Sequence, residues 1–68
     1  MYPAIGDKLR MKRLTRNLTQ KEAAKIIGVS VYMISAWEND RYFPSAVRME
    51  QLAALYDISA EELLDYDI

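Results

Sequence analysis

The stretch LTQKEAAKIIGVSVYMISAWEN, residues 18–39 of this 68-residue chain, constrains the fold most, because it carries start and stop signals for two short helices in succession. Thr19 is a favourable N-cap, and Glu22, three residues later, completes a capping box. Gly28 supplies the left-handed residue that ends the first helix. Ser30 is a second N-cap, from which another helix begins. The stretch therefore predicts two helices joined by a tight turn.

Two helices joined by a turn that contains glycine are the sequence form of a helix-turn-helix unit, which we place at about residues 19–39. Such a unit holds its second helix, predicted over residues 31–39, where it can enter a groove of DNA. Binding of DNA is therefore the first functional hypothesis that the residues themselves suggest.

The residues before the helix-turn-helix predict one more helix, from Pro3 or Ala4 to about Arg16. Within it, Ile5, Leu9 and Arg13 recur every four residues and so share one face. An arginine on an inward face requires a partner, because an unpaired buried charge is costly.

Two further helices are predicted after residue 39. One runs from Ser45 or Ala46 to Tyr56; its core-facing residues are Met49, Leu52, Ala53 and Tyr56. The other is capped by Ser59, with Glu62 at the capping-box position, and its Leu63 and Leu64 are expected to pack back on the core. The loop over residues 40–45 contains a proline that disfavours helix at Phe43. The chain is therefore predicted to be all-α and a single domain over residues 1–68, with no internal repeat or linker.

Composition excludes several classes of function. The chain contains neither cysteine nor histidine, which removes disulfides, zinc-finger chemistry and the commonest general base and metal ligand. We expect no enzyme activity and no catalytic residue, and we expect no metal, cofactor or small-molecule ligand. There is no apolar run of membrane-spanning length and no secretory signal, so we expect a cytoplasmic protein that does not bind membranes.

The charges are divided unequally along the chain, although the formal net charge is only −1. Residues 1–41 carry eight Lys or Arg against four Asp or Glu, and residues 42–68 carry one against six. A domain with this distribution can present its basic side to phosphate and turn its acidic end away. The alternative is that the mixed charges only solvate the surface.

The chain resembles the phage repressor/Cro-type helix-turn-helix family of transcriptional regulators, also called xenobiotic response element-like. The resemblance lies in the segment IGDKLRMKRLTRNLTQKEAAKIIGVSVYMISAWEND, followed by PS and LAALYDISAEELL. The resemblance covers roughly residues 5–64, and its most specific parts are LTQ, GVS and ISAWEN in this order and spacing. It implies a compact five-helix domain with a central helix-turn-helix that binds operator DNA, usually as a dimer.

The resemblance also implies roles for individual residues. Arg13 and Glu38 match a structural ion pair of the family, and Gln20 matches a glutamine that clamps a phosphate and buttresses the recognition helix. Asn17 and Asp40 stand where the family generally has glycine, and Asp57 stands at a third such position. Asn and Asp tolerate the left-handed conformation that these positions require.

A helical wheel divides the helix over residues 31–39 into two sides. Ile34, Trp37 and Glu38 face inward with Met33 at the edge, whereas Val31, Tyr32, Ser35, Ala36 and Asn39 face outward. The expected base contacts are Val31, Tyr32, Ser35 and Ala36. They offer apolar contacts, best with a thymine methyl, and single hydrogen bonds, and none of the four is an Arg, Gln or Asn able to make a bidentate base contact. Direct readout of bases is therefore expected to be modest, with DNA shape supplying the rest.

The predicted DNA-binding residues also include phosphate contacts on both sides of the groove. Gln20 and Lys21 open a helix whose positive end favours an anion, and Asn39, Arg41 and Tyr42 can hold the opposite strand. The full candidate set is Gln20, Lys21, Ser30, Val31, Tyr32, Ser35, Ala36, Asn39, Arg41 and Tyr42.

Two questions stay open at this level. The apolar start of the helix over residues 31–39 also suits a protein interface, so an antitoxin-like or adaptor module with weak or no DNA binding is the alternative function. We expect a homodimer at least on DNA, with two half-sites about 34 Å apart. Its candidate surface comprises Leu55, Leu64, Tyr66 and Ile68, although the last two could instead fray at the terminus.

Overall fold

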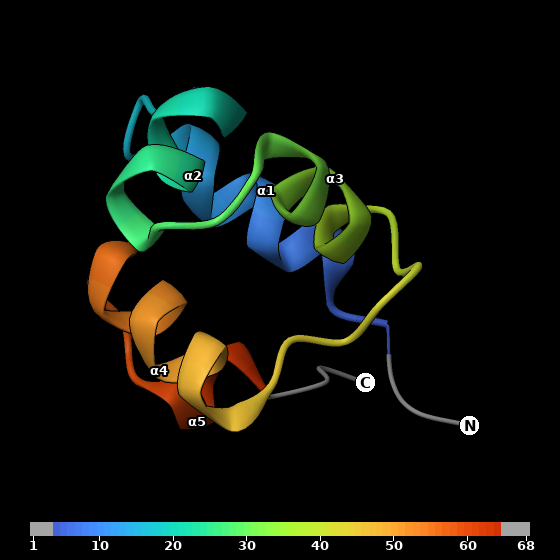
Figure 1. Ribbon diagram of the computed structural model, residues 1–68. Helices are drawn as coiled ribbons and strands as arrows, with labels where there is room; N and C mark the ends of the chain where they lie inside the picture. The colour runs from blue at the N-terminus through green and yellow to red at the C-terminus, as the bar shows by residue number, and fades with distance from the viewer. Residues whose placement is uncertain (1–3, 65–68) are drawn as a thin grey trace.

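The computed structural model describes residues 4–64, which form five α-helices and no strand (Figure 1). The helices are α1 (Gly6–Thr15), α2 (Gln20–Ile27), α3 (Val31–Glu38), α4 (Ala46–Leu55) and α5 (Ala60–Leu63). The predicted all-α architecture with a central helix-turn-helix is confirmed. None of the described helices is long and apolar enough to cross a membrane.

Side-chain caps explain where four of the helices begin. The Thr19 hydroxyl accepts a hydrogen bond from the Glu22 N–H at 3.0 Å, and the Glu22 carboxylate accepts one from the Thr19 N–H at 2.8 Å, so the predicted capping box is present. Ser30, Ser45 and Ser59 each accept from the backbone N–H three residues later. Each cap satisfies a free N–H of the first turn and is worth about 1 kcal/mol.

The first helix starts later than the sequence predicted, at Gly6 instead of Pro3 or Ala4, and it ends at Thr15 instead of Arg16. No local side chain caps it; the Gly6 N–H instead donates to Asp40 Oδ1 at 2.9 Å, from the loop after α3. A partner 34 residues away in the sequence sets this boundary, so local capping signals could not place it.

Gly6 is also the point where α1 approaches the end of α3 most closely. A Cβ built on Gly6 would lie 2.2 Å from the Glu38 carbonyl oxygen and 2.9 Å from Asp40 Oδ2. Only glycine fits between these atoms without a shift of the backbone. No local sequence signal marks this glycine, because the atoms that crowd it belong to Glu38 and Asp40.

Four residues adopt the left-handed backbone conformation that ends helices and forms tight turns. Gly28 has φ 87°, and Asn17, Asp40 and Asp57 have φ 57°, 59° and 59°. The prediction that Asn17 and the two aspartates replace glycine at left-handed positions is confirmed. For residues other than glycine this conformation costs roughly 1–2 kcal/mol, and Asn and Asp adopt it more readily than other residues.

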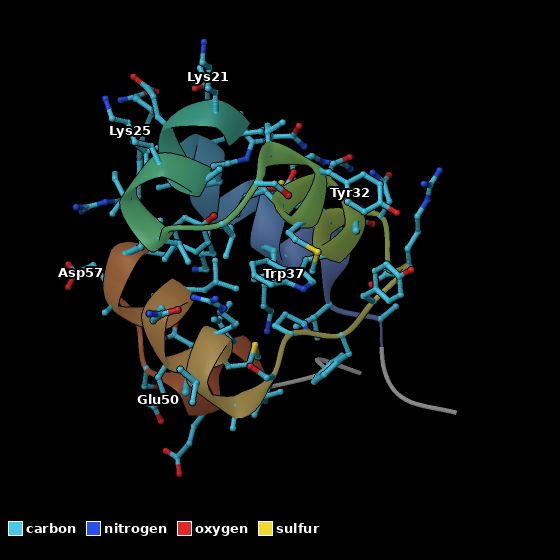
Figure 2. The ribbon with its side chains drawn as sticks, in the orientation of Figure 1. Lys21, Lys25, Tyr32, Trp37, Glu50 and Asp57 are labelled. Atoms are coloured by element: carbon cyan, nitrogen blue, oxygen red, sulfur yellow. The ribbon has the colours of Figure 1, made fainter. Side chains whose placement is uncertain are left out.

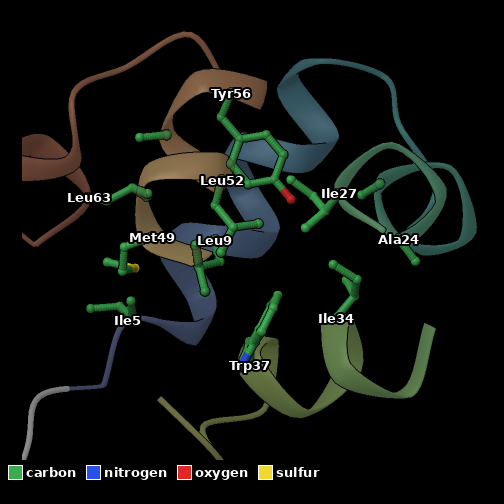
Figure 3. Close-up of a cluster of buried hydrophobic side chains, with 12 residues drawn as sticks. Ile5, Leu9, Ala24, Ile27, Ile34, Trp37, Met49, Leu52, Tyr56 and Leu63 are labelled. Carbon is green, nitrogen blue, oxygen red and sulfur yellow. The ribbon is translucent and has the colours of Figure 1, made fainter. Parts of the chain in front are cut away.

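All five helices contribute to one core, shown in Figure 3. This cluster includes Ile34 and Trp37 of α3 together with Leu9 of α1, Leu52 of α4 and Leu63 of α5. The predicted inward faces of α1 and α4 are confirmed, since their apolar members are at most 4% exposed.

The core prediction for the last helix is half wrong. Leu63 is fully buried, but Leu64 remains 38% exposed. The helix α5 has only four residues, so it presents one side to the core and leaves its C-cap residue Leu64 outside.

Candidate nucleic-acid interface

The helix α3 lies at the surface with one side in the core and the other in solvent. Ile34 and Trp37 are 1% and 3% exposed, whereas Val31 and Tyr32 are 48% and 53% exposed. Figure 2 shows Trp37 pointing into the molecule and Tyr32 pointing away from it. Asn39 is exposed at the C-cap and Ser35 is half-buried one turn earlier. A continuous stripe of α3 is therefore available to a partner.

One predicted contact residue does not belong to this stripe. Ala36 is 1% exposed, so the helical-wheel prediction that it faces outward is wrong. After α3 the chain turns back, and the Arg41 N–H donates to the Ala36 carbonyl at 2.9 Å. A methyl group is too short to reach past this returning chain, and the helical wheel took no account of residues beyond the helix. Ala36 is removed from the candidate contacts.

The ion pair implied by the resemblance is present and buried. Arg13 Nε donates to Glu38 Oε2 at 2.7 Å and Nη2 donates to Oε1 at 3.0 Å, and both side chains are less than a tenth exposed. The third Arg13 nitrogen, Nη1, donates to the Leu18 carbonyl at 2.8 Å. The hydrogen bond to Glu38 raises the pKa of Arg13, so the guanidinium stays charged in its buried position. This pair fixes the end of α3 to α1.

Gln20 extends this network to α2. Its Nε2 donates to Glu38 Oε1 at 3.0 Å, so one carboxylate receives donors from both α1 and α2. The half-buried Gln20 thus supports the end of α3, as the resemblance implied. The second N–H of Gln20 Nε2 can still donate to a phosphate oxygen.

Burial also changes the pKa of Tyr56, which lies within the electrostatic influence of Arg13 and Glu38. Tyr56, the C-cap of α4, is 4% exposed. Desolvation raises the pKa of Tyr56 to about 12, and the negative charge of Glu38 adds to the shift. The phenol therefore stays neutral and part of the core at ordinary pH.

The other predicted phosphate contacts are at the surface. Lys21, Ser30, Arg41 and Tyr42 are exposed, at the start of α2, the start of α3 and the loop after α3. Lys21 and Arg41 form no ion pair with any residue that the structure describes. Positive donors thus lie before and after the exposed stripe of α3.

The uneven distribution of charge along the chain is also a distribution in space. Figure 2 shows Lys21 and Lys25 on α2, well separated from Glu50 at the far end of the molecule on α4. Asp57 lies on the same side as α4. Lys21 and Lys25 therefore lie apart from Glu50, whereas Lys8 of α1 donates to the Glu62 carbonyl of α5, so the predicted separation of charge is only partial.

The predicted dimer surface is divided in the structure. Leu55 lines a groove of about 360 Å³ with Ile26, Ile27, Gln51 and Ala54, between α2 and α4. Leu64 lines a separate groove of about 400 Å³ with Phe43, Pro44, Ala46, Met49, Glu50 and Ala60. Leu55 and Leu64 therefore do not form one surface patch, and Tyr66 and Ile68 lie outside the described residues.

Between residues 4 and 64, no three His, Cys, Asp or Glu side chains gather where they could hold a metal ion. The arrangement described above consists instead of hydrogen-bond donors, exposed apolar groups and positive charges around one surface helix. Such a surface binds a polyanion and contacts base edges.

A sequence model of a helix-turn-helix family matches residues 9–63, which is most of the chain. The chain belongs to this helix-turn-helix family. The domain is 34% identical over 63 residues to an uncharacterized helix-turn-helix-type transcriptional regulator of Methanocaldococcus jannaschii, covering 93% of this chain and 96% of that protein. The resemblance to regulators of the repressor/Cro type is confirmed.

Two further comparisons, one of sequence and one of structure, give the same result. It is 31% identical over 60 residues to the transcriptional activator BcrR of Enterococcus faecalis, covering 88% of this chain but only 29% of BcrR. Its fold matches the P22 c2 repressor, solved in complex with a synthetic operator, with a TM-score of 0.87, 28% identity and coverage of 96% and 98% of the two chains. By its family, this chain is a helix-turn-helix DNA-binding domain of the kind found in transcriptional regulators.

Proposed function

We propose that this helix-turn-helix domain regulates transcription by occupying operator DNA, with α3 in the major groove. The observation that carries the proposal is the exposed stripe of α3, which is backed by Ile34 and Trp37 and accompanied on both sides by cations that form no ion pair within residues 4–64. The major groove is wide enough to admit such a helix. The likeness to the P22 c2 repressor, which is bound to an operator in its solved structure, supports the same placement.

Within this proposal the residues divide by role. Val31, Tyr32 and Ser35 contact base edges, and Ser30, at the N-terminal end of α3, lies beside them. Gln20, Lys21, Arg41 and Tyr42 hold phosphates and fix the position of α3 without specifying sequence. Residues 1–68 act as one domain, and repression follows where the occupied site overlaps a promoter.

Few phosphate contacts per domain imply weak binding by a single copy, so we also propose that two copies bind two half-sites about 34 Å apart. The divided positions of Leu55 and Leu64 mean that such a dimer uses one of the two apolar grooves, not both together.

Electrophoretic mobility shift at two or more salt concentrations tests the proposal. We expect a shift that weakens with salt, and we expect Gln20→Ala and Arg41→Ala to weaken it for all sequences. Arg41→Ala should also lower the slope of log affinity against log salt by roughly one. Arg48→Ala removes the same charge from α4 and is the matched control, for which we expect little change. If the parent gives no shift even at low salt, the chain is a protein-interaction module instead.

A further inference from the structure

The side chain of Asn39 folds back over the last turn of α3. Its Nδ2 donates to the Ser35 carbonyl at 2.8 Å and lies 3.2 Å from the Ser35 hydroxyl oxygen. Both contacts are at the surface, and they join the C-cap residue to the residue four positions earlier. The carboxamide of Asn39 is therefore held at the level of Ser35, one turn nearer the start of the helix.

The chemistry of these two contacts fixes which atoms point outward. A backbone carbonyl only accepts, so the Asn39 atom beside it must be the nitrogen, and the amide oxygen Oδ1 is turned away. The Ser35 hydroxyl oxygen also accepts from this nitrogen, which leaves the hydroxyl hydrogen free to donate elsewhere. Among residues 4–64, nothing accepts from the Ser35 hydroxyl and nothing donates to Asn39 Oδ1. Ser35 thus offers a donor and Asn39 an acceptor, side by side.

This pair lies on the side of α3 that the proposed function turns toward DNA. Val31, Ser35 and Asn39 are four residues apart, so they follow one stripe along the helix. Val31 is half exposed and Asn39 is exposed. Because recognition helices contact bases mainly through their N-terminal part, the folding back of Asn39 brings its oxygen toward the bases and away from the far strand.

We propose that Ser35 and Asn39 together select adenine, an inference that rests on the proposed function. The Ser35 hydroxyl donates to adenine N7, and Asn39 Oδ1 accepts from the adenine N6 amino group. Adenine alone among the four bases presents an acceptor and a donor on its own major-groove edge. Guanine presents two acceptors, of which O6 would face the oxygen of Asn39, and thymine and cytosine each match only one atom of the pair.

The proposal changes the role of Asn39 from that predicted from the sequence. A phosphate offers only acceptors, so it cannot bond with the outward Oδ1, and the Asn39 nitrogen is already engaged by Ser35. Asn39 is therefore a specificity-determining residue instead of a phosphate contact.

Selection of bound sites from random duplexes tests this assignment with the parent chain, Ser35→Ala, Asn39→Ala and the double variant. We expect the parent to prefer A at one position of each half-site, and both single variants to lose that preference at the same position. The loss should lie between about 5-fold and 150-fold in relative affinity for A against the other bases. The double variant should lose little more than either single variant, because the two residues act as a unit.

Two controls separate reading of a base from other effects. Ser35→Thr keeps the hydroxyl and should keep the preference for A, and Arg41→Ala should weaken all sequences equally. Thermal melting followed by circular dichroism checks that each variant is folded. Uniform weakening of all sequences by Asn39→Ala would assign Asn39 to a phosphate and overturn the proposal. Loss at two different positions would also overturn it, and a folded parent that binds no duplex would overturn the proposed function as well.

Discussion

Replacing Arg13 with alanine should remove most of the stability of this domain. Glu38 would remain buried at 4% exposure with Gln20 as its one side-chain donor, and the Leu18 carbonyl would lose the Arg13 N–H. Breaking a buried ion pair by removing one partner costs about 3–5 kcal/mol. A core of this size supplies a similar total, about 3–5 kcal/mol. We therefore expect Arg13→Ala to be largely unfolded at 25 °C or to melt at least about 12 °C below the parent.

The chain contains its own control for this experiment. Arg10, also on α1, forms an ion pair with Asp7 at 2.9 Å, but the two side chains are 49% and 89% exposed. Such a surface pair is worth at most about 1 kcal/mol, so Arg10→Ala should melt within a few degrees of the parent. The two substitutions delete the same type of side chain from the same helix, and they differ mainly in the burial of the arginine and of its partner.

A double variant separates the pairing of charges from the volume of the side chains. In Arg13→Met with Glu38→Leu, neither charge is left buried alone, so most of the lost stability should return. Circular dichroism at 222 nm during heating and during urea titration measures all four proteins. If Arg13→Ala melted at the same temperature as Arg10→Ala, the buried pair would not be the structural link that the geometry describes.

Three further predictions concern the rest of the fold. Because the pKa of Tyr56 is raised from 10.0 to about 12, its contribution to stability should be constant below pH 10 and fall between pH 10 and 12, by at most about 3 kcal/mol, as the unfolded chain ionises first; urea titration of Tyr56→Phe should show less of this fall than the parent. Gly6→Ala should destabilise by about 1–3 kcal/mol because its Cβ would meet the Glu38 carbonyl, and equal melting of parent and variant would show that the backbone yields freely. Asp40→Asn should melt close to the parent, because asparagine keeps an oxygen for the Gly6 N–H and tolerates φ 59°. Asp40→Ala loses both and should cost about 2 kcal/mol. Equal melting of the two variants would contradict the role of Asp40 as the cap of α1.

The fold was predictable where its signals are local. Thr19, Ser30, Ser45 and Ser59 each precede a helix that the structure contains, and each bonds to the N–H three residues later. Short-range hydrogen bonds of this kind depend on residue type and spacing, both of which the sequence displays directly. The turn at Gly28 was predictable for the same reason.

The start of α1 and the burial of Ala36 were not predictable in this way. Asp40 caps Gly6 from 34 residues away, and the chain after α3 covers Ala36, so both depend on how distant segments meet. A helical wheel places a residue relative to its own helix axis and contains no information about a loop that returns over it. The resemblance supplied one long-range contact, between Arg13 and Glu38, that spacing alone could not have paired.

The site was predictable as a set of residues but not as a set of atoms. Helical periodicity placed Val31, Tyr32, Ser35 and Asn39 on the exposed side of α3, as the structure has them. It could not show that Asn39 bonds to Ser35, and this contact decides whether the carboxamide presents its oxygen or its nitrogen. Base readout depends on which atoms donate and which accept. Specificity therefore depends on the orientation of each side chain, which the list of exposed residues does not give.

The network around Glu38 links this specificity to the stability of the fold. Its carboxylate receives Arg13 from α1 and Gln20 from α2, and the residue that follows it is Asn39, the outer member of the proposed reading pair. A shift of the last turn of α3 would therefore break buried hydrogen bonds before it moved Asn39 far from Ser35. A buried pair is a weak source of net stability but a strong penalty against alternative arrangements. The position of α3 on the surface decides which bases it can reach. In a chain with so small a core, the main effect of the Arg13–Glu38 pair is therefore to disfavour other positions of α3.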